Sequence, residues 1–167
     1  MTTQHLFSRL LVLAALSSVS AFAQMAPSNV TISDAWARAT VPGQKASGAF
    51  MKLTAKEGVK LVSVSSPAAA VAEIHEMKMD KDVMKMAALP NGVELPAGKA
   101  VELKPGGYHV MLMDLKAPLT KDSTVPLTLV FEDAKGVKTP VDIKIPVSTQ
   151  TPMMGQGMGH SHGDHKH

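Results

Sequence analysis

The sequence has 167 residues, with 17 lysines and arginines against 14 aspartates and glutamates, and no cysteine. The positive excess is too small and too evenly spread for a nucleic-acid surface, which needs a concentrated basic stripe and often stacking rings. The lack of cysteine excludes disulfides and thiolate metal sites, including the blue-copper centre of electron-transfer proteins. The length allows one domain with its own core, followed by a tail.

The first residues have the features of a secretory signal peptide. Arg9 supplies positive charge, residues 10–16 form a short apolar run, and Ala21-Phe22-Ala23 is an A-x-A pattern. The apolar run is shorter than the ~20 residues that a membrane-spanning helix needs. We therefore expect cleavage after Ala23, a periplasmic location and a mature chain that does not insert into a membrane.

The body of the chain has the alternating pattern of β-strands. Turn sequences rich in proline and glycine separate the apolar runs, as at residues 90–92, 96–98 and 105–107. Strands are expected at residues 30–38, 47–53, 60–65, 72–79, 83–89, 100–103, 109–113, 126–131 and 141–147. Eight or nine short strands without a helical period predict an all-β Greek-key sandwich or barrel.

The composition changes after Val147. We expect a signal peptide at residues 1–23, a folded domain at 24–147, and a linker with a Met/His-rich tail at 148–167. The tail has no apolar face to bury, so it should be disordered without a ligand. Its candidate metal ligands are Met153, Met154, Met158, His160, His162, His165 and His167.

The two histidines of the folded body each have a methionine two positions later. His75 precedes Met77, and His109 precedes Met111. At strand spacing the two side chains of each pair point to the same face. Three methionine pairs share this spacing, namely Met77 with Met79, Met84 with Met86, and Met111 with Met113. A methionine on a strand more often fills a core, so the argument for a metal site rests on the combination with histidine and with the tail.

Thioether sulfur is soft and neutral, so it suits Cu(I) and binds Zn²⁺ or Mg²⁺ poorly. A site of two histidines and two methionines carries no ligand charge, which suits a monovalent ion. Methionine also resists oxidation better than a thiolate. The imidazole-rich tail favours Cu(II), with its methionines helping to hold the ion after reduction. These residues therefore predict a copper-binding protein.

The residues around both histidines resemble the periplasmic copper chaperone A family, known as PCuAC. The resemblance covers residues 30–147 and lies in His75-Glu76-Met77, in Met84-Lys85-Met86 and in residues 103–113. Ten residues separate His75 from Met86, as in the family, and 22 separate Met86 from His109, one more than the family's usual spacing. The extra residue leaves Met84 and Met86 as alternatives for the same ligand position.

The resemblance implies a cupredoxin-like β-barrel with Cu(I) held near the surface by His75, Met86, His109 and Met111. It also implies delivery of copper to the CuA centre of cytochrome c oxidase, directly or with a Sco-type protein. We expect a monomer that is not an enzyme, because two body histidines do not assemble a Ser-His-Asp set or a three-ligand zinc site. Copper sequestration in the periplasm is the alternative function.

Overall fold

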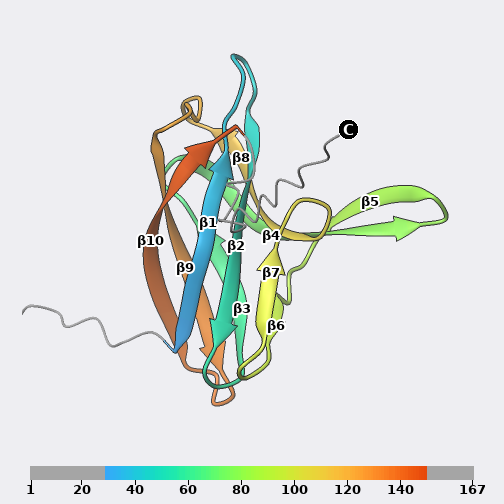
Figure 1. Ribbon diagram of the computed structural model, residues 1–167, viewed down its shortest axis with the longest axis vertical. Helices are drawn as coiled ribbons and strands as arrows, with labels where there is room; N and C mark the ends of the chain where they lie inside the picture. Colours follow the sequence, from blue (N-terminus) through green and yellow to red (C-terminus); the bar gives the residue numbers. More distant parts are fainter. Residues whose placement is uncertain (1–28, 150–167) are drawn as a thin grey trace, which may run out of the picture.

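The computed structural model describes residues 29–149, which form ten β-strands (Figure 1). The strands are β1 (Val30–Arg38), β2 (Ala46–Ala55), β3 (Val59–Ser65), β4 (Ala69–Asp80), β5 (Val83–Ala88), β6 (Val93–Leu95), β7 (Ala100–Leu103), β8 (Tyr108–Leu115), β9 (Thr124–Asp133) and β10 (Lys138–Ser148). The described residues contain no helix that could cross a membrane. The expected signal peptide and the seven candidate tail ligands lie outside the described residues.

The strands follow the order β5-β4-β8-β7-β2-β1-β10-β9-β3-β6, and β8 also pairs with β2. The first six strands make one layer and the last four make the other. A short parallel pairing, Ala37 with Val147 and Arg38 with Ser148, joins the layers. The predicted all-β class is confirmed. The expected eight or nine strands are corrected to ten, because the three-residue β6 lies between two turn sequences and is too short to show alternation.

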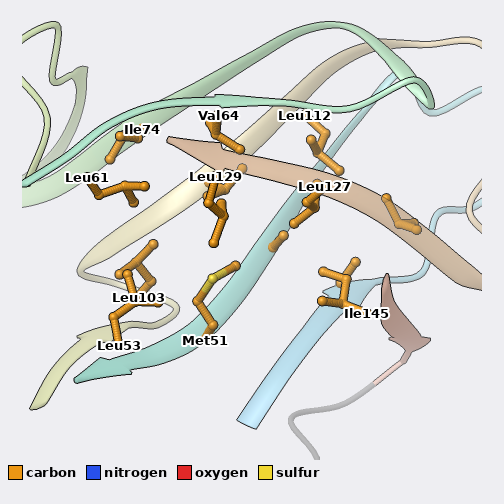
Figure 2. Close-up of a cluster of buried hydrophobic side chains, with 14 of the residues drawn as sticks. Met51, Leu53, Leu61, Val64, Ile74, Leu103, Leu112, Leu127, Leu129 and Ile145 are labelled. Atoms are coloured by element: carbon orange, nitrogen blue, oxygen red, sulfur yellow. The ribbon is translucent and has the colours of Figure 1, made fainter. Parts of the chain in front are cut away.

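The core lies between the two layers and consists mainly of leucine, valine and isoleucine (Figure 2). Leu53 and Leu112 from the first layer meet Leu61, Leu127 and Leu129 from the second, and all are at most 1% exposed. Burial of a side chain of this size contributes about 1.5–3 kcal/mol. The fold therefore has its own source of stability, independent of any metal.

A β-bulge in β1 decides which face Trp36 occupies. The register of β1 against β2 shifts between Ser33 and Trp36, and Asp34 has a positive φ of 56°. Such a bulge adds one residue to one strand and reverses the alternation beyond it. Ala37 therefore points into the core, while Trp36 pairs with Phe50 on the outer face of the first layer.

The β4–β5 hairpin projects from the body of the molecule (Figure 1). The last residue of β4 that pairs with β8 is Glu76, and the strand beyond it pairs only with β5. Lys81 and Asp82 form the tip, and both have positive φ, as a two-residue type I′ turn requires. All six residues of β5 are exposed. The hairpin therefore adds little to the core.

We expect Leu129→Ala to lower the free energy of unfolding by about 2–5 kcal/mol, because it opens a cavity between the layers. Met84→Ala, on the projecting hairpin, should change it by no more than about 0.5 kcal/mol. Urea denaturation followed by circular dichroism measures both. Similar losses in the two variants would mean that the hairpin belongs to the cooperative core.

Candidate metal centre

The two histidines of the body lie side by side on neighbouring strands. His75 of β4 is the direct cross-strand partner of His109 of β8. Their ring centroids are 5.8 Å apart, in an edge-on arrangement at 66°. The two residues are 8% and 6% exposed, respectively. Partners in an antiparallel pair point to the same face of the sheet, so both rings are available to one ion.

This face is the outer face of the first layer, turned away from the main core. The residues that precede or follow each histidine, Ile74 and Val110, point into the core. The histidines therefore face the other way and are buried by a separate set of side chains. Met111 shares their face, because Glu73, its cross-strand partner, lies two positions before His75 on β4.

An aromatic cluster covers one side of the histidines. The Phe50 ring lies 6.4 Å from the His109 ring and 4.7 Å from the Trp36 ring. The Arg38 guanidinium carbon lies 5.5 Å from the centroid of the Phe50 ring, within the range of a cation–π contact. A Cβ at Gly48 would come within 2.7 Å of Phe50 Cζ, so glycine at this position leaves room for the ring. The bulge in β1 brings Trp36 to this cluster.

The hydrogen bonds of the two rings fix which nitrogen carries a proton in the neutral form. His75 Nε2 lies 2.8 Å from Glu73 Oε2, and a carboxylate only accepts, so Nε2 donates. His109 Nδ1 lies 3.0 Å from the Gly107 carbonyl oxygen and donates to it. The free lone pairs are therefore on Nδ1 of His75 and Nε2 of His109.

His75 Nδ1 is buried and has no hydrogen-bond partner. Leaving a buried polar atom unpaired costs about 1–3 kcal/mol, so native structures rarely do so without a reason. A metal ion would satisfy this lone pair. The contact with Glu73 matches the usual arrangement in which a ligating histidine donates its other N–H to a carboxylate.

The Gly107 carbonyl also holds the hairpin. It accepts the backbone N–H of Met77 at 3.1 Å as well as His109 Nδ1–H. The turn before β8 therefore links the His109 ring of β8 to the backbone of β4, at the residue where the hairpin leaves the body.

A cavity of about 540 Å³, open to solvent, lies on this face. Three of the four expected main-site ligands, Met86, His109 and Met111, line it. His75 does not line the cavity and lies beside His109. The other residues that line the cavity are Arg38, Gln44, Lys45, Ala46, Ser47, Gly48, Phe50, Met77, Pro105 and Gly106. The lining contains no carboxylate, and its soft or borderline metal donors are the thioethers of three methionines and the imidazole of His109.

Two residues of the site were missing from the ligand set expected from the sequence. Met77 lines the cavity opposite Met86, its cross-strand partner. Glu73 holds His75. Strand spacing places both on the face of His75, one two positions after it and the other two before, so this signal could have found them. Met84 pairs with Met79 one step further out and does not line the cavity, which favours Met86 of the two alternatives.

A family model described as "LpqE-like: Putative lipoprotein LpqE-like" matches residues 30–143. The chain belongs to the LpqE-like family. The chain is similar to "Putative lipoprotein Lxx21020" of Leifsonia xyli subsp. xyli (strain CTCB07), with 34% identity over 116 residues, which cover 70% of this chain and 69% of that protein. "Uncharacterized protein RP573" of Rickettsia prowazekii (strain Madrid E) is 32% identical over 103 residues, or 59% of this chain and 57% of that protein.

Solved structures similar to this LpqE-like chain include PCuAC domains. The solution structure of apo-DR1885 from Deinococcus radiodurans has a TM-score of 0.55 and 26% identity, covering 90% of this chain and 97% of that one. The structure of CuI-DR1885 has a TM-score of 0.50 and 29% identity, covering 77% and 83%. The copper-bound PCuAC domain from PmoF2, with a TM-score of 0.58 and 24% identity over 75% and 97%, shares the fold. The predicted PCuAC resemblance and cupredoxin-like class are confirmed.

We expect ¹⁵N NMR of the metal-free protein at neutral pH to show His75 protonated at Nε2 and His109 at Nδ1, because each donor has an oxygen that can only accept. Glu73→Ala should let the His75 ring exchange between both tautomers. The His109 tautomer should not change in that variant and serves as the internal control. A His75 ring protonated mainly at Nδ1 in the wild type would contradict the hydrogen-bond assignment.

Proposed function

We propose that this protein is an exported, periplasmic copper chaperone that holds Cu(I) with His75, Met86, His109 and Met111 and passes it to another protein. The observation that carries the proposal is the unpaired, buried Nδ1 of His75, on a ring whose centroid lies 5.8 Å from that of His109, next to a cavity lined by thioethers. The names of two similar structures, CuI-DR1885 and the copper-bound PmoF2 domain, support copper as the ion.

The charges around the cavity favour a monovalent ion. The four proposed ligands are neutral, while Arg38 and Lys45 line the same cavity. Coulomb repulsion from these cations is twice as large for a divalent as for a monovalent ion at the same place. The Glu73 carboxylate, bound to His75, offsets part of this repulsion. Soft donors and flanking cations together select Cu(I) over Cu(II) and Zn²⁺.

The open cavity and neutral ligands also suit release. A thiolate from a partner brings negative charge and softness that imidazole and thioether lack, so transfer of Cu(I) to cysteine is downhill. The ion stays in the +1 state, and the incoming thiol loses its proton to solvent. We propose the CuA-bearing subunit of cytochrome c oxidase, or a Sco-type protein, as the acceptor. The proposed role is binding and transfer by a monomer, without catalysis. The tail is proposed as a secondary site that takes Cu(II).

Removal of one proposed ligand at a time tests the site. We expect His75→Ala, His109→Ala, Met86→Leu and Met111→Leu each to weaken Cu(I) binding by about tenfold or more, since even the loss of an outer hydrogen-bond partner of a ligand typically costs 10–100-fold. Competition with a Cu(I) chelator under anaerobic conditions measures the affinity.

Met113→Leu is the matched control for the ligand variants. Met113 lies on β8, two positions after Met111, and it does not line the cavity. The Met113→Leu variant should bind Cu(I) with the same affinity as the wild type. Near-wild-type affinity in all four ligand variants, with the fold intact by circular dichroism, would rule out this site.

Mixing the Cu(I)-loaded protein with a reduced CuA domain or a reduced Sco-type protein tests transfer. We expect most of the copper on the cysteine-containing partner after separation, because thiolate ligands are stronger donors. Metal analysis of each fraction gives the distribution. Copper that stays on this protein at equilibrium with both partners would favour the alternative of periplasmic sequestration.

A further inference from the structure

The projecting β4–β5 hairpin has two faces of different chemistry. One face carries two cross-strand methionine pairs, Met77 with Met86 and Met79 with Met84. The other face carries the charged side chains of Glu76, Lys78, Asp80 and Lys85. On that face Lys78 bonds Glu76 at 2.7 Å, which raises the pKa of Lys78, and Lys85 pairs with Asp80. The hairpin is therefore amphipathic, although its apolar face does not turn toward the core.

Three of the four methionines on this face are exposed to solvent. Met79 is 65% exposed, Met86 is 50% exposed and Met84 is 44% exposed. Of the seven methionines among residues 29–149, only Met51 is buried. Exposed apolar area gains none of the roughly 25 cal/mol per Å² that burial supplies. Packing in the core therefore does not explain why methionine occupies these exposed positions.

The choice of residue points to the sulfur atom. Strands favour β-branched and aromatic residues over methionine, yet the two pairs on this face contain methionine at all four positions. A surface kept only for its apolar character would be served by valine, isoleucine or leucine. What methionine adds is a soft, polarizable thioether, and this donor suits Cu(I).

The spacing allows two thioethers to meet at one ion. Side chains directly opposite each other on antiparallel strands have Cβ atoms about 4.5–5.5 Å apart. Methionine has three rotatable side-chain bonds, so both sulfurs of a pair can turn toward the space between them. The outer pair, Met79 with Met84, lies one two-residue repeat, or about 7 Å, from the inner pair. The inner pair, Met77 with Met86, lines the cavity of the candidate metal centre.

We infer that Met79 and Met84 form a second, all-thioether site for a soft monovalent cation, and that the ion moves from it through Met77 and Met86 into the cavity. The passage inward rests on the proposed function, but binding at the outer pair does not. Each step exchanges one neutral ligand for another, so neither the oxidation state nor any proton changes. With two thioethers and no imidazole, the outer site should bind more weakly than the main site and exchange faster.

Titration of the full-length protein with Ag(I), a soft monovalent ion that does not change oxidation state, tests the outer site. The protein carries ¹³C-labelled methionine methyl groups, so each thioether reports separately by NMR, including those of the tail. We expect the Met86 and Met111 signals to shift with the first equivalents and the Met79 and Met84 signals to shift at higher Ag(I). The double variant Met79→Leu/Met84→Leu should bind one equivalent fewer and keep the Met111 shift.

Met113→Leu again provides the control and should retain the wild-type stoichiometry. The inference is overturned if the Met79 and Met84 signals do not move after every other site is saturated, or if the double variant binds as many equivalents as the wild type. Shifts of Met79 and Met84 without shifts of Met86 and Met111 would support the outer site while contradicting the proposed main site. The two proposals therefore fail in different ways.

Discussion

The antiparallel register of β4 against β8 is the constraint on which the site depends. It places His75 opposite His109 and turns both rings away from the core. A slip of one residue would move every side chain of the strand to the other face. The apolar residues next to these ligands on the same strands, Ile74, Val110 and Leu112, fix this register because they must stay in the core. The packing of the core therefore positions a site with which it shares no side chain.

The two faces of the first layer have separate tasks. The inner face contributes aliphatic side chains to the core, and the outer face contributes histidine, methionine and an aromatic cluster. Because Phe50 lies against His109 and Trp36 packs on Phe50, and neither ring belongs to the main core, the site can be low in polarity and still lie near the surface. Such an environment strengthens electrostatic selection among ions and leaves the stability of the fold largely independent of the ligands.

Much of this arrangement could be predicted from the sequence because strand alternation is a local signal. The spacing in His75-Glu76-Met77 and His109-Val110-Met111 is enough to place each pair on one face. The contact between the two histidines depends on the pairing of distant strands, which single-strand patterns do not contain. The β-bulge at Asp34 also escapes such patterns, since an unbroken alternation would keep Trp36 on the face of Ile32. Strand spacing places Glu73 on the face of His75, but the hydrogen bond between the two side chains is identified only in the structure.

The carbonyl of Gly107 makes the hairpin and the imidazole of His109 parts of one mechanical unit. One oxygen accepts both the Met77 backbone N–H and the His109 ring N–H. A carbonyl has two lone pairs, so both bonds can be full ones. Bending the hairpin at its root strains the bond that orients the ring. A movement of the hairpin at its root would therefore also change the orientation of the His109 ring.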